Sequence, residues 1–454
     1  MKMNAFKAYD IRGEYPSDIH EDLAYKLGLA FVAEYNARKI VVGRDIRESS
    51  PVLFERLVAG ILAGGCDVIS LGICGTEEVY FNTAIQGADG GIMITASHNP
   101  KNHNGFKLVG KGAEPISLDS GLLQLKVRIL DGRLPMSDIH GAFSEYSDRM
   151  PYLESLLDFI PEFRKMPARL KVVCNSGNGC AGSIVDLLET DLPLEIIKVH
   201  HEADGTFPNG VPNPLLFERR EATRTAVLAS KADFGVAWDG DFDRCFFFDE
   251  HGEFIDSSYI VGLLASELLR EDPGSTIVID TRQTLNSEHA IENAGGKMII
   301  SAGGHSPMKR TMRKYEALYG GEMSAHHYFR DFHYCDSGMI PFLLISSLLA
   351  RSDKTLGELV SDARHLYPCS GELNYVVGVP LVVIEALADY FKDQAISIDY
   401  IDGLSVRLPK ARVNIRSSNT ENYLRINIES ENDVVLVTKL KTEIEAILAP
   451  YLSL

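Results

Sequence analysis

Three aspartates at alternating positions, Asp239, Asp241 and Asp243, are the residues of this sequence best suited to chemistry. They come directly after an apolar run at 234–238, and Gly240 gives them a tight turn. Three carboxylates on such a turn can converge on one hard cation and leave coordination positions for a phosphate, which suits Mg²⁺. Two alternatives stay open, namely an Asp-rich turn solvated at the surface and a partial calcium loop.

A second candidate loop is TASHNP at 95–100, after the predicted strand 91–95. Ligands of open α/β folds bind beyond the carboxyl ends of the strands, so Ser97 stands where a nucleophile could act. A serine hydroxyl needs a base or a metal to become reactive. The sequence has no convincing G-x-S-x-G elbow, which counts against an α/β-hydrolase. The alternative is a polar turn whose side chains only satisfy the backbone.

Two later loops carry groups that suit a phosphorylated sugar. In GGEMSAHH, at 320–327, Glu322 and Ser324 can hydrogen-bond sugar hydroxyls. The adjacent histidines do not favour a transition-metal site, because neighbouring side chains diverge on a strand or loop. In RSSNTE, at 416–421, an arginine stands with hydroxyls and amides on a turn, which suits a phosphate monoester. A polar hairpin loop is the alternative there.

The elements that must position these loops alternate between strand-length apolar runs and segments of helical period, which predicts an α/β protein. Strands are predicted at 39–43, 66–71, 91–95, 170–174, 194–199, 234–238, 276–280 and 297–301, and helices at 49–64, 77–86, 181–189, 219–230, 259–270 and 286–294. The C-terminal part differs, with paired strands at 411–415 and 423–428 and a final helix at 434–448. We predict four domains, at 1–150, 151–250, 251–367 and 368–454.

Composition excludes several classes of protein. Of the 454 residues, 45% are hydrophobic and 24% charged, as in ordinary globular chains. The net charge of −18 counts against nucleic acid or an anionic membrane as the main partner. The longest strongly apolar run, at 339–350, is shorter than the roughly 20 residues of a membrane span. The N-terminus lacks the apolar core of a secretion signal. Seven cysteines without a C-x-x-C pair favour a reduced, cytoplasmic location. The oligomeric state is not predicted.

The order of these loops resembles that in the α-D-phosphohexomutase superfamily, and within it the bacterial phosphomannomutases. The resemblance extends over essentially the whole chain and rests on KAYDIRG at 7–13, TASHNP at 95–100, NGFK at 104–107, DGDFDR at 239–244, GEMSAHHYF at 321–329 and RSSNTE at 416–421. It implies an α/β fold of three mixed α/β domains plus a smaller C-terminal α+β domain around a central cleft.

The resemblance also implies residue roles. Ser97 matches the serine that is phosphorylated in the active enzyme, and its phosphate would join Asp239, Asp241 and Asp243 as ligands of one Mg²⁺ per chain. Arg12, Lys107 and His98 match residues near the reacting serine. Matches to the substrate site are Tyr9, Arg244, Arg282, Gly304, His305, Glu322, Ser324 and His326, and the phosphate cradle would be Arg416, Ser418, Asn419 and Thr420. The chain departs from many relatives at Gly303, where they have Thr, at Arg282, where some have Lys, and at Phe242, where broader relatives have Gly.

The implied activity interconverts α-D-mannose 6-phosphate and α-D-mannose 1-phosphate through a phosphoserine and a hexose 1,6-bisphosphate, which also serves as catalytic activator. The product would feed GDP-mannose for surface polysaccharide synthesis. The nearest alternative is a dual phosphomannomutase/phosphoglucomutase, because the two sugars differ only at C2 and one contact is worth about 1–3 kcal/mol. A phosphoglucosamine mutase fits the sugar loop less well. A non-catalytic phosphosugar-binding protein is opposed by the intact serine, aspartates and Arg416.

Overall fold

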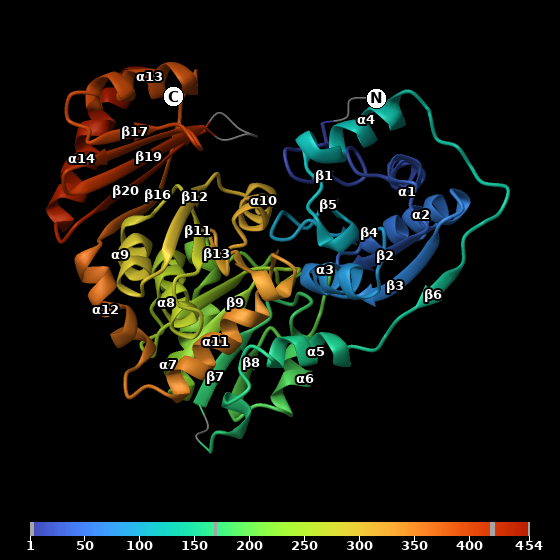
Figure 1. The fold of residues 1–454 in the computed structure, drawn as a ribbon, viewed down its shortest axis with the longest axis horizontal. Coiled ribbons are helices and arrows are strands. Elements are labelled where there is room, and N and C mark those ends of the chain that lie inside the picture. The colour runs from blue at the N-terminus through green and yellow to red at the C-terminus, as the bar shows by residue number, and fades with distance from the viewer. Residues whose placement is uncertain (1–3, 168–169, 418–422, 453–454) are drawn as a thin grey trace. The chain divides into compact units, whose positions relative to one another are not determined.

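The computed structural model describes residues 4–167, 170–417 and 423–452. The chain forms two compact units, which are described separately below. Figure 1 labels their helices and strands. The first unit comprises residues 1–254 and 326–355, and the second comprises residues 255–325 and 356–454.

The first unit begins with a six-stranded mixed sheet, in the order β1-β5-β4-β2-β3-β6. Strands β2, β3 and β4 are parallel, whereas β5 runs antiparallel to both β1 and β4. The strands are β1 (Ile11–Glu14), β2 (Lys39–Arg44), β3 (Asp67–Ile73), β4 (Gly90–Ile94), β5 (His103–Gly110) and β6 (Phe143–Glu145). The helices that follow or precede them are α1 (Glu21–Tyr35), α2 (Ser50–Ala63), α3 (Thr76–Ile85) and α4 (Leu123–Leu130).

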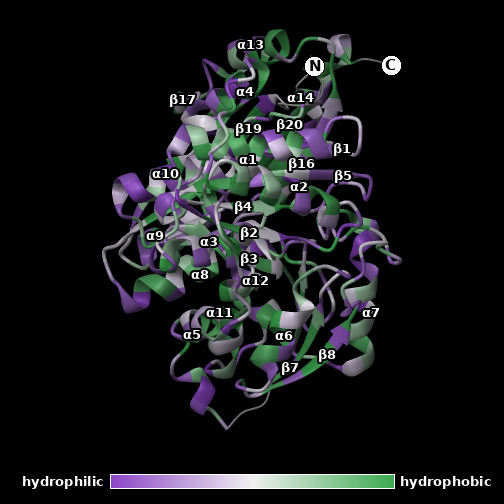
Figure 2. Cartoon of the chain, turned by 90° about the vertical axis from the view of Figure 1, so that its right-hand side faces the viewer, coloured by the Kyte–Doolittle hydropathy of each residue, from purple (hydrophilic) through white to green (hydrophobic). Residues whose placement is uncertain are grey.

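Alternation along β2 explains the layers around this sheet. Ile40 and Val42 belong to the large core that includes α1 and α2, whereas Val41 belongs to a smaller core with Val79 of α3. Because successive side chains of a strand point to opposite faces, both faces of β2 are covered by helices. Figure 2 shows hydrophobic (green) and hydrophilic (purple) residues mixed along the helices.

A second sheet of the first unit has the order β10-β9-β7-β8. Its strands are β7 (Leu170–Asn175), β8 (Leu194–Val199), β9 (Phe234–Trp238) and β10 (Cys245–Phe248). The helices in this stretch of the chain are α5 (Met150–Leu157), α6 (Gly182–Glu189) and α7 (Glu221–Ser230). Strand β10 returns antiparallel to β9, so residues 239–244 form the turn between them. The unit is completed by β14 (His327–Phe329), β15 (Cys335–Asp336) and α11 (Met339–Ala350).

Helix α11 accounts for the longest apolar run of the sequence. Ten of its twelve residues are buried, so it is a core helix of the first unit. Among the described residues, no helix combines the length and the apolar character that crossing a membrane requires.

The second unit contains three parallel strands in the order β12-β11-β13. These are β11 (Thr276–Asp280), β12 (Lys297–Ser301) and β13 (Tyr319–Gly321), with helices α8 (Ser257–Glu271), α9 (Leu285–Asn293), α10 (His305–Tyr315) and α12 (Leu356–Leu366). A C-terminal antiparallel sheet follows, in the order β16-β20-β19-β18-β17. Its elements are β16 (Cys369–Val376), α13 (Pro380–Phe391), β17 (Ser397–Asp399), β18 (Leu404–Leu408), β19 (Ala411–Ser417), β20 (Tyr423–Ser430) and α14 (Val434–Leu448).

The α/β prediction is confirmed. Every helix and strand that the sequence predicts is present, with ends that agree to within two residues. The four domain boundaries stay a prediction.

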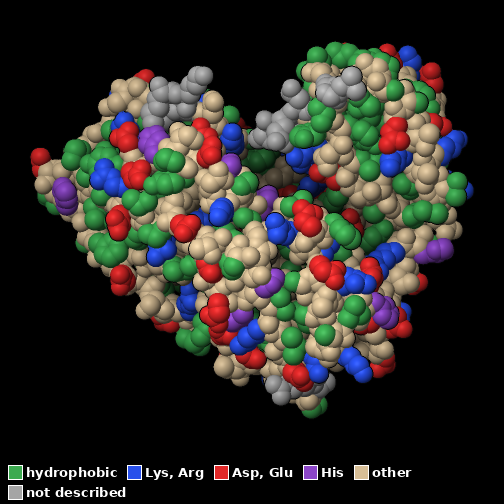
Figure 3. Space-filling model, turned by 180° about the vertical axis from the view of Figure 1, so that it is seen from behind, with side chains coloured by type: hydrophobic (Ala, Val, Ile, Leu, Met, Phe, Trp, Pro, Cys, Tyr) green, Lys and Arg blue, Asp and Glu red, His purple; other side chains and the backbone are tan. Residues whose placement is uncertain are grey.

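Hydrophobic side chains remain on the surface among charged ones, as Figure 3 shows, which is normal for a folded chain.

Candidate active site

The serine loop leaves the carboxyl end of β4, as the sequence predicts. Ser97 is buried and has a φ of 51°, a left-handed conformation that a non-glycine residue adopts only when its surroundings impose it. Arg47 supplies that constraint, because its Nη2 donates to the carbonyls of Ser97 at 2.8 Å and Asn99 at 2.7 Å. Asp45 in turn pairs with Arg47 at 3.3 Å. The loop after β2 therefore fixes the backbone of the serine loop.

The Ser97 hydroxyl lies within a network of charged groups. It donates to Oδ2 of Asp239 at 2.6 Å and accepts from Nη2 of Arg244 at 3.0 Å. Nδ1 of His98 lies 3.0 Å from the same hydroxyl and also contacts Arg244. Burial and the charge of Arg244 hold the pKa of His98 well below its usual value. His98 is therefore a neutral imidazole beside the serine.

The three aspartates of the turn after β9 are buried, with exposed fractions of 0%, 0% and 1% for Asp239, Asp241 and Asp243. The alternative of a turn solvated at the surface is therefore wrong. One oxygen from each carboxylate can be chosen so that all three atoms lie within 4.8 Å of one another. The sequence prediction that these side chains converge is confirmed by this geometry.

Each of these carboxylates uses its two oxygens differently. The Oδ2 atoms accept hydrogen bonds, from Ser97 and Arg244 in the case of Asp239 and from Lys107 in the case of Asp241 and Asp243. The three Oδ1 atoms are buried and accept no hydrogen bond from any described residue. A buried carboxylate oxygen without a partner is costly, and a hard divalent cation is the partner that oxygen ligands prefer. The residues present therefore fit Mg²⁺.

Lys107 and Arg244 balance part of the negative charge. Burial alone would lower the pKa of Lys107, but the carboxylates of Asp241 and Asp243 raise it above its usual value. Arg244 follows the same pattern, with burial opposed mainly by Asp239. Lys107, for its part, lowers the pKa of Asp241 against the effect of burial. Both cations therefore keep their charge beside the serine loop.

Other predicted residues of the first unit lie around this centre. Arg12 of β1 donates to the Asn99 side chain of the serine loop at 2.9 Å and pairs with Asp10 at 2.6 Å. The backbone of His326 pairs with that of Arg244 in a single antiparallel β-bridge, and Nδ1 of His326 lies 3.0 Å from Oδ2 of Asp336. His326, Asp336 and Asp243 also form a second group that could hold a cation. Tyr9 is half-buried just before β1.

A second cluster, in the second unit, contains the predicted sugar loop. Arg282 donates to Asp280 at 2.7 Å, to Glu322 at 2.9 Å and to Ser324 at 3.1 Å. Ser324 donates to Glu322 at 2.8 Å, and the backbone N–H of Gly304 donates to the other oxygen of Glu322 at 3.0 Å. These residues lie at or just after the carboxyl ends of parallel strands β11, β12 and β13, where ligands of open α/β folds bind. His305 begins α10 and is half-buried.

Arg416 lies near the end of β19 in the same unit. Its Nη2 donates to Glu372 at 2.7 Å. Burial and the positive charge of Arg282 lower the pKa of Arg416, because the two guanidinium groups repel each other. An anion near both would relieve this repulsion. Ser418, Asn419 and Thr420, the rest of the predicted cradle, lie outside the described residues.

Several residues of the site were missed by the sequence analysis. Arg47, Thr76, Asp280 and Glu372 each contact a predicted site residue. The signal that could have found two of them is a repeated pattern. Asp45 and Arg47 come just after β2, and Asp280, the last residue of β11, is followed by Arg282. In each pair one residue separates the aspartate from the arginine at the end of a parallel strand.

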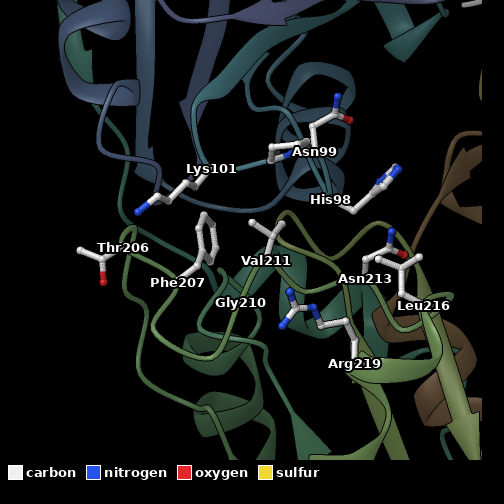
Figure 4. Close-up of a pocket in the computed structure, with 11 residues that line it drawn as sticks. His98, Asn99, Lys101, Thr206, Phe207, Gly210, Val211, Asn213, Leu216 and Arg219 are labelled. Atoms are coloured by element: carbon white, nitrogen blue, oxygen red, sulfur yellow. The ribbon is translucent and has the colours of Figure 1, made fainter. Parts of the chain in front are cut away.

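A cavity of about 690 Å³ opens beside the serine loop (Figure 4). His98 and Asn99 lie on one side, and Val211, Asn213 and Arg219 lie on the other. A solute can therefore approach the serine loop within the first unit.

Comparison with known proteins agrees with this geometry. Models of the phosphoglucomutase/phosphomannomutase family match residues 3–122, 150–252 and 256–367 as α/β/α domains I, II and III, and residues 375–447 as the C-terminal domain. The chain belongs to this family and is an isomerase of the phosphohexomutase class. The fold expected from the resemblance, three α/β domains and a C-terminal domain, is thereby confirmed.

Individual relatives cover nearly the whole chain. A protein named phosphohexose mutases from Xanthomonas campestris pv. campestris is 48% identical, over 99% of this chain and 100% of its own length. A phosphomannomutase from Escherichia coli K12 is 46% identical, over 96% of this chain and 97% of its own. The crystal structure of a phosphoglucomutase/phosphomannomutase family protein from Burkholderia thailandensis superposes with a TM-score of 0.90 at 30% identity, covering 99% and 98% of the two chains.

Proposed function

We propose that this phosphohexomutase interconverts α-D-mannose 6-phosphate and α-D-mannose 1-phosphate through a phosphoserine at Ser97. The observation that carries the proposal is the buried Ser97 hydroxyl, which donates to Asp239. Asp239 is one of three carboxylates that each keep one oxygen without a hydrogen-bond partner among the described residues. The mannose preference is supported by the 46% identical relative from Escherichia coli, which is named phosphomannomutase.

The reaction consists of two phosphoryl transfers. Phosphoserine 97 gives its phosphoryl group to the free hydroxyl of the hexose monophosphate. A P–O bond to the sugar oxygen forms, the P–O bond to the serine oxygen breaks, and the proton of the sugar hydroxyl ends on the serine oxygen. The product is a hexose 1,6-bisphosphate, which after turning over returns its other phosphoryl group to Ser97. The same bisphosphate restores Ser97 in dephosphorylated enzyme, which makes it the activator.

Asp239, Asp241 and Asp243 would hold Mg²⁺, which neutralises charge on the transferring phosphoryl group. Arg244 donates to the Ser97 oxygen, and Lys107 binds Asp241 and Asp243. Both keep their positive charge, which stabilises the negative charge that develops during the transfer. Arg12 orients the serine loop through Asn99. His98, a neutral imidazole, lies beside the serine, and Tyr9 and His326 are further residues that the family resemblance assigns to the site.

Glu322 and Ser324 bind the C3 and C4 hydroxyls of the sugar, and Arg282, Gly304 and His305 support them. Arg416, with Ser418, Asn419 and Thr420, binds the phosphate that does not react. Because the C3 and C4 hydroxyls exchange approximate places when the sugar turns over, one loop serves both orientations. This arrangement leaves C2 weakly recognised.

A dual phosphomannomutase/phosphoglucomutase is the second candidate. It is favoured by the relatives at 48% and 30% identity, whose names cover phosphohexoses or both sugars. In either case we propose that the enzyme works in the cytoplasm and that mannose 1-phosphate is consumed in forming GDP-mannose for surface polysaccharide.

The test is the pair of kcat/KM values for mannose 1-phosphate and glucose 1-phosphate, measured on the wild type and on Glu322→Ala. We expect mannose 1-phosphate to be preferred, glucose 1-phosphate to be turned over measurably, and the variant to lose both activities by similar factors. Loss of the mannose reaction alone would place specificity on Glu322 and contradict the proposal. EDTA should abolish both activities and Mg²⁺ should restore them. A wild type without turnover of either sugar would favour the non-catalytic alternative.

A further inference from the structure

The first turn of α3 lies directly against the turn that carries the three aspartates, and Thr76 is the contact. Its backbone N–H donates to the carbonyl of Asp241 at 3.1 Å, and its hydroxyl donates to Oδ2 of the same residue at 2.5 Å. Thr76 is fully buried and lies 165 positions from Asp241 in the sequence. One residue of α3 therefore holds both the backbone and the carboxylate of Asp241.

The start of α3 is itself held in place on both sides of Thr76. On one side, a Cβ added to Gly75 would lie 2.2 Å from the ring of Phe242, so only glycine allows this close approach. On the other side, the buried carboxyl group of Glu77 accepts from the Ser337 hydroxyl at 2.9 Å and from the Gly338 N–H at 2.6 Å. Thr76 is thus held in place by its neighbours, and the Asp241 side chain is oriented by its contact with Thr76.

The consequence for Asp241 is that its two oxygens are not equivalent. Oδ2 receives the Thr76 hydroxyl and, at 2.6 Å, the ammonium of Lys107, whereas Oδ1 is buried without a hydrogen-bond partner among the described residues. Lys107 alone does not determine this orientation, because the same ammonium also binds Asp243 and sits at the end of a flexible chain. The hydroxyl of Thr76, which is on a short side chain, determines the orientation of the Asp241 carboxylate.

We infer that Thr76 is a positioning residue for the cation site. It binds Oδ2 of Asp241 and thereby turns Oδ1 toward the place where the cation binds. Groups that orient a metal ligand in this way typically change metal affinity by about 10–100-fold when they are removed. The inference rests on the proposed Mg²⁺ site, and no step of the reaction needs Thr76 to touch the substrate.

The test measures Mg²⁺ binding to the full-length chain after removal of metal, by titration calorimetry and by the rise of the unfolding temperature with Mg²⁺ concentration. Thr76→Val keeps the shape of the side chain and removes the hydroxyl, and it should bind Mg²⁺ about 10-fold or more weakly. Thr76→Ser keeps the hydroxyl and should remain within about threefold of the wild type. At saturating Mg²⁺, kcat of Thr76→Val should recover toward that of Thr76→Ser.

The matched control is Thr83→Val. Thr83 is buried on the same helix, and its hydroxyl donates to the carbonyl of Val79 within that helix. This variant loses a buried hydroxyl from α3 without a contact to Asp241, so its Mg²⁺ affinity should equal that of the wild type. If Thr76→Val does not fold, Thr76→Ala removes the same hydroxyl and carries the same expectation.

Two outcomes would overturn the inference, and they are distinguishable. A wild type that binds Mg²⁺ and a Thr76→Val or Thr76→Ala variant that binds it equally well would overturn the role of Thr76 alone. A wild type that binds no Mg²⁺ would overturn the proposed metal site and the inference together.

Discussion

At the scale of single residues, the site depends on atoms that are held in one orientation. Ser97 adopts a left-handed backbone conformation, and Arg47 binds the carbonyls on both sides of His98. The Ser97 hydroxyl is then directed at Asp239. The arrangement places the serine oxygen next to charged groups before any substrate arrives, which reduces the reorganisation that phosphoryl transfer requires.

Ser97→Ala should lose nearly all mutase activity, because no other described hydroxyl bonds to Asp239. Intact-mass analysis of the wild type should detect a fraction about 80 Da heavier, one phosphoryl group replacing a proton, which peptide mapping places on Ser97. Ser346→Ala is a suitable control, because this buried hydroxyl bonds only within α11, to Phe342. Wild-type kcat in Ser97→Ala would refute the phosphoserine mechanism.

At the scale of elements, the loops after β4 and β9 approach each other closely. A Cβ added to Gly240 would lie 2.8 Å from the carbonyl oxygen of Ser97. This distance is shorter than real Cβ contacts, so a side chain there must push the serine loop away from the aspartates. The absence of a side chain at position 240 is thus part of how the two loops come together.

Gly240→Ala should therefore lower kcat by at least about 10-fold, since small displacements of reacting groups reduce rates strongly. The unfolding temperature should change much less than kcat. Gly110→Ala is the matched control, because the nearest atom to its added Cβ is 3.9 Å away. Equal activity of the two variants would show that the loops tolerate separation.

Glu77 links α3 to the start of α11 and predicts a dependence of stability on pH. Burial raises the pKa of this carboxyl from its ordinary 4.5 to about 8, although hydrogen bonds from Tyr152, Gly338 and Ser337 oppose the shift. The folded state therefore keeps a proton that the unfolded state releases between these values. The contribution of Glu77 to stability is full below about pH 4.5, is lost as the pH rises toward 8, and changes no further above that value.

The loss should amount to a few kcal/mol, roughly 1.4 for each pH unit of the window. Glu77→Gln carries no titrating proton, so its stability should decline less between pH 6 and pH 8.5. The free energy of the first unfolding transition in urea, determined at pH 6 and at pH 8.5, measures this difference. Identical pH slopes for the variant and the wild type would contradict the assignment to Glu77.

At the scale of the whole molecule, the proposed function divides its tasks between the two compact units. The serine, the aspartates and Lys107 belong to the first unit, whereas Arg282, Glu322 and Arg416 belong to the second. The two half-reactions need a phosphate held in one place while the other phosphate reacts. We therefore expect the second unit to act in the same way in both directions of the reaction.

Arg416→Ala should lower kcat/KM in the forward and reverse directions by similar factors, because one charge-assisted contact to the non-reacting phosphate is lost in both. Arg416→Lys should recover part of the loss, since it restores the charge without the planar fork. Arg407→Ala is the control, because Arg407 lies on the same sheet and pairs with Glu288 and Glu431. A defect in one direction only would show that the cradle is not shared.

The sequence determined which loops carry the chemistry and which elements carry the loops. The strand at 234–238 (FGVAW) is apolar throughout and the one at 276–280 (TIVID) has an apolar interior, so their ends and the polar loops after them were recognisable. Helix α10 was not identified, because its sequence HSPMKRTMRKY is mostly polar and its apolar side is narrow. Strand β5 was also missed as an element, since HNGFKLVG begins with polar residues and glycine.

Only the tertiary structure decided which side chains meet and how each is turned. Thr76 and Asp241 are 165 positions apart, and Ser97 and Asp239 are 142 apart. Local spacing contains no information about contacts at such separations, because they arise from the packing of whole sheets and helices. The distinction between the bound Oδ2 and the unpartnered Oδ1 of each aspartate has the same origin. It depends on donors brought in by α3, β4 and β5, which the sequence places far from the turn that they orient.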